Sequence, residues 1–210
     1  MPIFRFKEKL VYFSHIPKCG GTSIEEFVSK IPECQISFLD RNFYSSQHRN
    51  RWNTSSPQHI PGNAIARLFP ASYFDAYFAV VRHPAERFIS AFKFQKYVFK
   101  RIEFNTNINQ FAESILSRSI DINRSYDNHF LPQTLFLFPD VTYKIFKLES
   151  GLTSVKKYLE TFLGAEISHL SIPHSMRFVD SWHSDADVLS DIGKDLLQKI
   201  YQDDYKKFNY

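Results

Sequence analysis

The chain has 210 residues, of which 43% are hydrophobic and 23% are charged, and its 26 basic and 22 acidic residues leave a net charge of +4. These values are typical of a globular protein, and the length suits a single domain over residues 1–210 with one substantial core. The mild charge, without a long basic run, argues against nucleic acid as a partner. It still suits a pocket for a nucleotide that carries several negative charges.

The cysteine content and the N-terminus exclude further classes. Cys19 and Cys34 are too few for a disulfide framework, and no Cys/His cluster has the spacing of a zinc site. The first seven residues lack the apolar core of a signal peptide, and no apolar run is long enough to cross a bilayer. If the chain is complete, we therefore expect a cytoplasmic protein.

The first informative segment is His-Ile-Pro-Lys-Cys-Gly-Gly-Thr-Ser at residues 15–23. An apolar run at 10–13 predicts a strand before it, and a helix-compatible run at 24–28 follows it. A glycine turn between a strand and a helix places free backbone N–H groups and the helix dipole against an anion. The sequence therefore predicts a phosphate-binding loop made by Lys18, Cys19, Gly20, Gly21, Thr22 and Ser23.

The position of the lysine distinguishes this loop from a Walker A motif, in which Lys follows the second Gly and precedes Ser or Thr. Here Lys18 precedes both glycines. The variant Pro-Lys-Cys-Gly-Gly-Thr-Ser resembles the 5′-phosphosulfate loop of sulfotransferases that use 3′-phosphoadenosine 5′-phosphosulfate (PAPS). The alternative is an ordinary Gly-Gly turn beside a surface lysine, with Cys19 as a compact filler.

The next segment, residues 40–63, is polar and is predicted to form a loop or lid, and a short helix is expected within 60–70. This stretch contains His59. Carbohydrate 2-O-type sulfotransferases have a catalytic histidine in a similar place, so the resemblance implies that His59 is the general base. The alternative is a histidine that packs within the loop.

A second motif spans residues 77–94. The run 77–81 predicts a buried strand, and Pro84 predicts the start of a helix that extends to about residue 100. Arg82 follows the strand at its carboxyl end, where open α/β sheets bind ligands, and Ser90 lies two turns into the helix. The block Arg-His-Pro-x-x-Arg-Phe-x-Ser resembles the 3′-phosphate element of the same sulfotransferases. This resemblance implies that Arg82 and Ser90 bind the ribose 3′-phosphate.

Each of these residues also has a plainer interpretation. Arg82 can form a surface ion pair, and Ser90 can lie unused on the helix surface. Glu86 and Arg87 are predicted to be structural, through an ion pair or helix capping.

The rest of the chain predicts alternating strands and helices. Helices or helix-like turns are expected at 107–118, 123–138, 150–163 and 185–208, the last capped by Ser184 or Asp185, and a strand is expected at 141–148. The segments 128–133, 144–149 and 200–210 resemble later parts of the same sulfotransferases. We therefore expect an α/β, P-loop-like three-layer fold with a central parallel sheet flanked by helices.

The resemblance implies transfer of a sulfuryl group from PAPS to an acceptor hydroxyl, with release of the product PAP. Lys18 would stabilise the charge that grows on the bridging oxygen of the leaving group, so no metal is expected. His59 is the preferred base and His129 its rival. His15 is expected to order the loop through a backbone hydrogen bond or, as the alternative, to line the acceptor site. Arg177 is expected to be a plain surface arginine, with closure over the nucleotide as the alternative.

Two other functions remain open. One is a kinase-like phosphoryl transferase that uses ATP, and the other is a regulator that binds PAPS or PAP without turnover. The acceptor is expected to be a glycan or glycolipid first, then a small alcohol or a peptide tyrosine. The sequence does not address the oligomeric state.

Overall fold

The computed structural model describes residues 1–44, 52–117, 125–164, 167–173 and 185–210. Within these residues, five strands form one sheet in the order β3-β1-β2-β4-β5. Their bounds are Ile3–Phe6 (β1), Lys9–Ser14 (β2), Cys34–Ser37 (β3), Ala76–Val81 (β4) and Lys144–Lys147 (β5).

The centre of the sheet is parallel, as the sequence predicts. Strand β4 runs parallel to both β2 and β5, with Phe78 opposite Phe13 in one pair and opposite Lys144 in the other. Strand β1 runs antiparallel to β2 and to β3, so the sheet is mixed at this end. The sequence did not predict β1 and β3, which are only four residues long.

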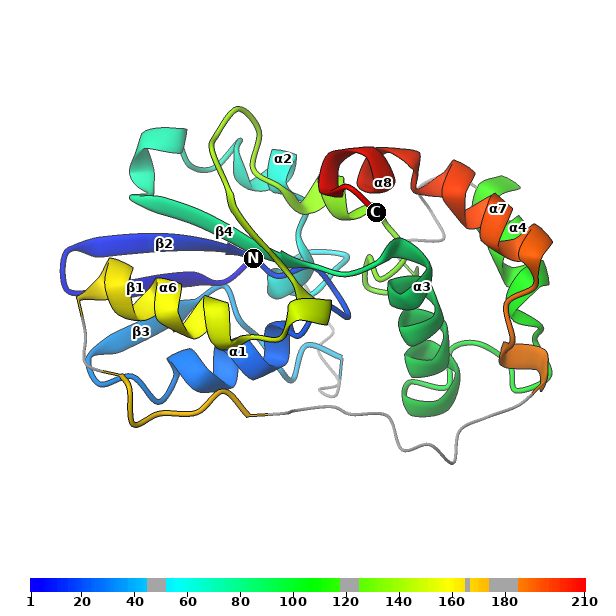
Figure 1. The fold of residues 1–210 in the computed structure, drawn as a ribbon, viewed down its shortest axis with the longest axis horizontal. Coiled ribbons are helices and arrows are strands. Elements are labelled where there is room, and N and C mark those ends of the chain that lie inside the picture. Colours follow the sequence, from blue (N-terminus) through cyan, green and yellow to red (C-terminus); the bar gives the residue numbers. More distant parts are fainter. Residues whose placement is uncertain (45–51, 118–124, 165–166, 174–184) are drawn as a thin grey trace.

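The aromatic side chains separate by face because successive residues of a strand point to opposite sides. On one face, the Phe13 and Phe78 rings stack at 4.7 Å, and the Phe78 ring packs 5.8 Å from the Tyr158 ring. Tyr158 belongs to α6 (Thr153–Leu163), which lies beside α1 (Gly21–Val28) in Figure 1. On the other face, the Tyr12 ring lies 5.5 Å from the Phe138 ring. The sheet therefore has a covering layer on each side, in agreement with the predicted three layers.

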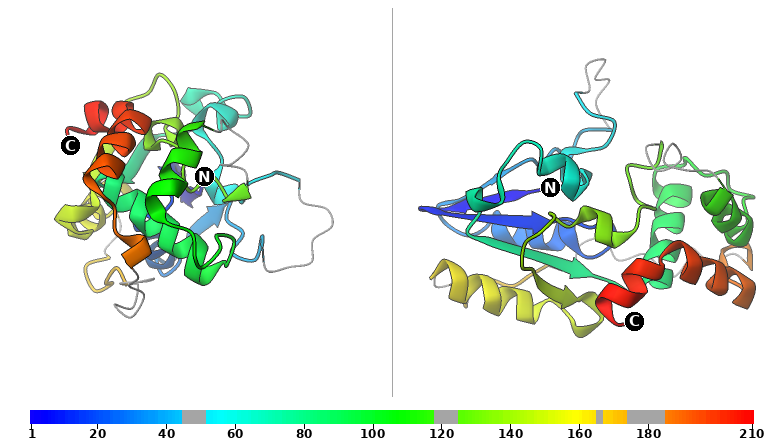
Figure 2. Two further views of the ribbon diagram at one scale, coloured as in Figure 1. Left: turned by 90° about the vertical axis from the view of Figure 1, so that its right-hand side faces the viewer. Right: turned by 90° about the horizontal axis from the view of Figure 1, so that it is seen from above.

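Four further helices gather beyond the carboxyl ends of the strands, at one end of the molecule (Figures 1 and 2). They are α3 (Pro84–Lys93), α4 (Ile108–Ser117), α7 (Asp191–Ile200) and α8 (Gln202–Phe208). Buried aromatic residues of these helices form a second hydrophobic cluster next to the core of the sheet. Strand β4 continues directly into α3, so the predicted ligand edge lies between the two clusters.

The helix expected to reach about residue 100 extends to Val98, because α3 ends at Lys93 and continues as a π-helical turn, η3 (Phe94–Val98). Other predicted boundaries are wrong. The helix expected over 185–208 is three segments, since the 3₁₀ turn η6 (Asp185–Asp187) precedes α7 and α8. The cap of α7 is the Ser190 hydroxyl, which accepts from the Gly193 N–H. Asp185 therefore does not cap α7, and Ser184 lies outside the described residues.

Other predicted elements are shorter than expected. Within 60–70 the helix α2 covers Gly62–Ile65, and the predicted strand at 141–148 is confined to β5. In the described part of 123–138, turns lead into a 3₁₀ helix, η4 (Gln133–Phe136). The predicted loop at 40–63 contains the 3₁₀ turn η1 (Pro57–His59), and its residues 45–51 lie outside the described part.

Candidate active site

The predicted phosphate loop joins β2 to α1. Gly20 precedes α1 with φ of 80° and Lys18 has φ of 67°, so the chain makes a tight left-handed turn here. The first N–H groups of an α-helix have no acceptor within the helix. In α1 the Ile24 N–H reaches the Gly20 carbonyl at 3.3 Å, and the N–H groups before it stand at the open helix end. Loop and helix thus have the strand–turn–helix geometry that the sequence predicts.

The loop residue Lys18 lies over an aromatic ring from another segment. Its Nζ is 3.9 Å from the centre of the Phe94 ring, which comes from η3. Burial, followed by the positive charge of Arg82, lowers the pKa of Lys18 to about 7. The positive charges of Lys18 and Arg82 repel one another, and an anion bound beside them would relieve that repulsion.

Arg82 and the loop are tied together by one buried side chain. The Gln133 amide accepts from the Arg82 N–H at 3.0 Å and donates to the Arg82 carbonyl at 2.8 Å. The same Gln133 oxygen accepts from the Cys19 thiol at 3.4 Å. Asp204 holds Gln133 in turn, because its carboxylate accepts from the Gln133 N–H at 2.8 Å. The two predicted phosphate motifs therefore lie side by side at one edge of the sheet.

The other residues of the second motif divide by burial. The Arg82 guanidinium is partly exposed and pairs with Glu86 at 3.5 Å, so the surface ion pair of the plainer interpretation is present. Arg87 is fully buried and donates to the carbonyls of His129 and Leu131 at 2.9 and 2.6 Å. Its role is structural, as predicted, but it acts through these backbone hydrogen bonds instead of the predicted ion pair or helix cap. Ser90 is 8% exposed on α3.

Cys19 is a buried thiol within the loop. Burial raises its pKa to about 12, so it stays protonated at neutral pH. This agrees with the predicted role as a compact filler.

His59 forms a carboxylate–imidazole pair with Asp127. The His59 Nδ1 lies 2.7 Å from the Asp127 carboxylate, and both side chains are buried. Asp127 has φ of 55° and the next residue, Asn128, has φ of 60°, a left-handed pair that turns the carboxylate toward His59. A carboxylate that accepts the Nδ1–H leaves the Nε2 lone pair of a neutral histidine available as a base.

Together with His129, this pair is also close enough to hold a metal ion, because ligand atoms of His59, Asp127 and His129 lie within 4.8 Å of one another. The hydrogen bonds favour the carboxylate–imidazole pair instead. One Asp127 oxygen accepts from the Ser56 N–H at 2.7 Å and the Tyr44 hydroxyl at 3.1 Å, and the other accepts from the Ser56 hydroxyl at 2.9 Å as well as from His59. These four bonds occupy the lone pairs that a metal would need.

His15 and His129 flank His59. The His59 ring centre lies 4.9 Å from that of His15 and 5.2 Å from that of His129. His15 Nδ1 bonds the carboxylate of Glu25 in α1, not a backbone group as expected. Burial lowers the pKa of His15 and, more strongly, that of His129. The preferred base and its rival thus lie together in a buried cluster, and the charge of Lys18 also acts on His129.

The sequence analysis missed Asp127 and Glu25. A signal for Asp127 exists, because an acidic residue stands two positions before His129 in the Asp-Asn-His sequence. Its pairing with His59 could not be read, since 68 positions separate the two. Gln133 belongs to the segment 128–133 that resembles the sulfotransferases, but the sequence does not show that its side chain links the two motifs. Arg177 lies outside the described residues.

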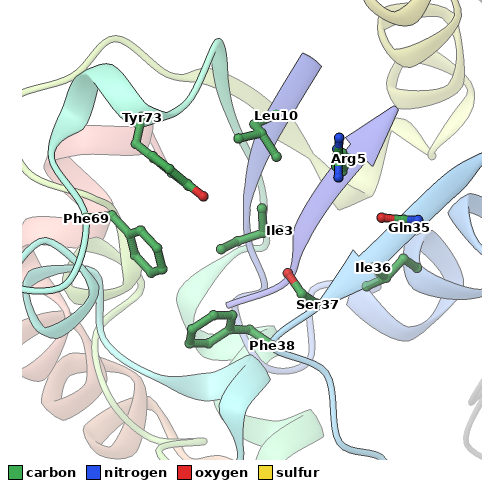
Figure 3. Close-up of a pocket in the computed structure, with 9 residues that line it drawn as sticks. All are labelled: Ile3, Arg5, Leu10, Gln35, Ile36, Ser37, Phe38, Phe69 and Tyr73. Atoms are coloured by element: carbon green, nitrogen blue, oxygen red, sulfur yellow. The ribbon is translucent and has the colours of Figure 1, made fainter. Parts of the chain in front are cut away.

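A separate pocket of about 450 Å³ lies beside β1 and β3. Figure 3 shows the rings of Phe38, Phe69 and Tyr73 at one end of it, and Arg5 and Gln35 at the other. It reaches β2 at Leu10, near the start of that strand, whereas the phosphate loop follows the end of the strand at Ser14. None of the predicted site residues lines it.

Among the described residues, no helix has the length and apolar character required to span a membrane. A model of the sulfotransferase family matches residues 1–210, the whole chain. Neither the curated proteins nor the solved structures contain a significant match.

Proposed function

Because the chain belongs to the sulfotransferase family, we propose that it transfers a sulfuryl group from PAPS to a hydroxyl of a carbohydrate-like acceptor and releases PAP. The observation that carries this proposal is the link through Gln133 between Arg82 and the glycine loop, at distances of 3.0 and 3.4 Å. A donor with phosphates at both its 5′ and 3′ positions needs two adjacent anion sites. The loop and Arg82 are two such sites at one sheet edge.

In this proposal the chain holds the donor at two places. The N–H groups of residues 20–23, with the Thr22 and Ser23 hydroxyls, bind the 5′-phosphate at the start of α1. The Cys19 N–H, expected to take part, donates instead to the Ile16 carbonyl at 3.3 Å. Arg82 and Ser90 bind the 3′-phosphate, Arg82 through charge-assisted hydrogen bonds. When bound, PAPS supplies the sulfuryl group that is transferred.

Three side chains carry the chemistry. His59 Nε2 takes the proton of the acceptor hydroxyl as the acceptor oxygen bonds to sulfur. Asp127 is a positioning residue, because it holds the Nδ1–H of His59 at 2.7 Å and stabilises the imidazolium that forms. Lys18 stabilises the negative charge that remains on the bridging oxygen when its bond to sulfur breaks. A bound polyanion favours the charged form of Lys18 and so raises its pKa from about 7.

The test is calorimetric titration of PAP, and of ATP with Mg²⁺, into the wild-type chain and the Arg82→Ala variant. Loss of charge-assisted hydrogen bonds worth about 1.5–3 kcal/mol should weaken PAP binding by about 10–100-fold. Arg67→Ala is the matched control, because Arg67 is exposed beside α2 and should leave PAP binding unchanged. Binding of ATP with Mg²⁺ in preference to PAP would contradict the proposal and support the kinase-like alternative.

The regulator alternative is tested by turnover. A panel of sugars, glycolipids, phenols and small alcohols is incubated with PAPS and the wild-type chain, and PAP release is measured. Release with a sugar or glycolipid supports the proposed acceptor class. Tight PAP binding without release on any acceptor would favour a regulator that binds the nucleotide without turnover.

A further inference from the structure

The orientation of the Gln95 amide fixes the tautomer of His129. Gln95 is fully buried in η3, and its Nε2 lies 3.1 Å from the Tyr126 carbonyl and 3.0 Å from His129 Nδ1. A carbonyl oxygen can only accept, so the amide atom that faces Tyr126 must be the nitrogen. The opposite orientation would set two acceptor oxygens 3.1 Å apart. Gln95 therefore donates to Tyr126 and to His129, whose Nδ1 must be unprotonated.

A neutral histidine with a bare Nδ1 carries its proton on Nε2. Burial, and the neighbouring His59, lower the pKa of His129 well below its ordinary value, which keeps the ring neutral. His59 is the opposite case, because its Nδ1 faces the Asp127 carboxylate at 2.7 Å and its proton belongs there. The two adjacent rings thus differ at Nε2, which is a hydrogen-bond acceptor on His59 and a donor on His129.

His129 lies between the base and the cation of the cluster. Its ring centre is 5.2 Å from that of His59 and 5.4 Å from that of Phe94, the ring that Lys18 covers at 3.9 Å. The only side-chain hydrogen bond that His129 forms with described residues is the one at Nδ1. Its Nε2–H is therefore free for a ligand bound between Lys18 and His59.

We propose that His129 is a catalytic hydrogen-bond donor, whose Nε2–H binds an oxygen of the transferring sulfuryl group, and that it is not the base. This proposal rests on the proposed function. In the transfer step the acceptor oxygen bonds to sulfur, its proton passes to His59 Nε2, and the electron pair of the broken bond stays on PAP. His129 loses no proton, and its hydrogen bond strengthens as charge spreads over the sulfuryl oxygens.

A neutral donor suits this position better than a third cation. Lys18 and Arg82 already repel one another, and His59 gains a positive charge during the step. A neutral N–H stabilises developing negative charge without adding to that repulsion. Gln95 is then the positioning residue that keeps the proton on the side of His129 that faces the reaction.

Nitrogen-15 NMR of the histidine rings in the full chain tests the tautomers without any ligand. Loss of one ring's signals in the His129→Gln variant assigns His129, and His59→Gln assigns His59. At neutral pH we expect a neutral His129 with the proton on Nε2 and a His59 with the proton on Nδ1. A His129 ring protonated on Nδ1, or on both nitrogens, would overturn the proposal.

Kinetics of two matched variants test the role. A glutamine amide reaches the place of Nε2 and keeps a donor there, whereas the shorter asparagine amide reaches only the place of Nδ1. His129→Asn should lower kcat by about 10²–10³-fold, as loss of one oxyanion donor does. His129→Gln should lower it much less, and PAP affinity should be unchanged in both. Equal losses in both variants would indicate a structural role and overturn the proposal.

The pH profile separates the donor from a base. His129→Asn should keep the loss of kcat/KM at low pH that protonation of the base causes in the wild type, because His59 is intact. Disappearance of that loss in His129→Asn would identify His129 as the base and overturn the proposal. Absence of PAP binding in the wild type would overturn the proposed function itself, whereas a wrong tautomer with intact transfer would overturn only the donor role.

Discussion

At the residue scale, Asp127 is the most consequential side chain that the sequence did not reveal. It accepts four hydrogen bonds, from Ser56 twice, from Tyr44 and from His59. Burial alone would raise its pKa, but His59, His129 and the Ser56 N–H together outweigh burial and hold the pKa below its usual range. Asp127 therefore stays ionised and keeps the Nδ1–H tautomer of His59.

Asp127→Asn tests this role. The amide keeps the size of the side chain but can present its N–H₂ to His59 and favour the wrong tautomer. We expect kcat to fall by about 10²–10⁴-fold, the usual contribution of general base catalysis, with PAP affinity unchanged. Asp140→Asn, in an exposed turn, is the control and should leave kcat unchanged. Steady-state kinetics and calorimetry check both quantities, and an Asp127→Asn variant with wild-type kcat would contradict the role.

Lys18 gives a prediction about protons. Its pKa of about 7 in the free chain means that at about pH 8 most of the protein holds a neutral amine. PAP favours the charged form, so binding at about pH 8 should take up a proton, and affinity should fall as pH rises above about 7. Calorimetry in two buffers with different heats of ionisation measures the uptake. Lys18→Met should abolish it, and Lys144→Met, at an exposed position where β5 begins, should not. Persistence of the uptake in Lys18→Met would assign the proton elsewhere.

At this scale, the sequence predicts where a residue lies when the order of the elements determines its position. The glycine loop and Arg82 follow strand ends, so their position at one sheet edge follows from the order of the elements. Asp127, Glu25 and Gln95 act through partners that are distant in sequence or through side-chain orientation, and neither leaves a periodic signal. The choice between His59 and His129 as base belongs to this second class.

At the element scale, the start of α1 is held against His15. A Cβ built on Gly21 would lie 2.2 Å from two atoms of the His15 ring, much closer than real contacts allow. Gly21 is therefore required by close approach of the helix to the imidazole rather than by its backbone angle. This contact joins the phosphate loop to the histidine cluster.

Gly21→Ala should displace either α1 or His15. We expect a loss of about 1–3 kcal/mol in the free energy of unfolding, the usual cost of overpacking, together with weaker PAP binding. Gly164→Ala is the control, because its Cβ meets nothing within 4 Å and it reports only the cost of a positive φ. Urea unfolding measures the first effect and calorimetry the second. If overpacking is the cause, adding His15→Ala to Gly21→Ala should restore part of the stability.

The elements show where periodicity is informative and where it is not. Helical spacing after Pro84 predicts one inner face for Phe88, Ala91, Phe92 and Gln95, and all four are fully buried. The change from α to π geometry after Lys93 has no signature in the spacing, yet it carries Phe94 and Gln95 into the site. Strands β1 and β3 were missed because four residues give too short an alternation to recognise.

At the scale of the whole molecule, a buried ion pair fastens the C-terminal segment to the helices near the site. Lys96 Nζ lies 2.7 Å from the Asp187 carboxylate, and the two side chains are 0% and 1% exposed. Lys96 also donates to the Thr106 carbonyl at 3.1 Å, and Asp187 accepts from the Tyr97 hydroxyl. The pair connects η3, which carries Gln95 and Phe94, to η6, which leads into α7 and α8.

Asp187→Asn should destabilise the whole chain, because it leaves the buried Lys96 charge without a counter-charge. Removal of one partner of a buried pair costs about 3–5 kcal/mol, whereas replacing both partners by apolar groups is often neutral. The double variant Lys96→Met/Asp187→Leu should therefore recover most of the loss in urea unfolding. Asp191→Asn, which breaks an exposed pair with Lys194, should leave unfolding unchanged. A double variant as unstable as Asp187→Asn would show that the hydrogen bonds to Thr106 and Tyr97, rather than charge compensation, hold η6 against η3.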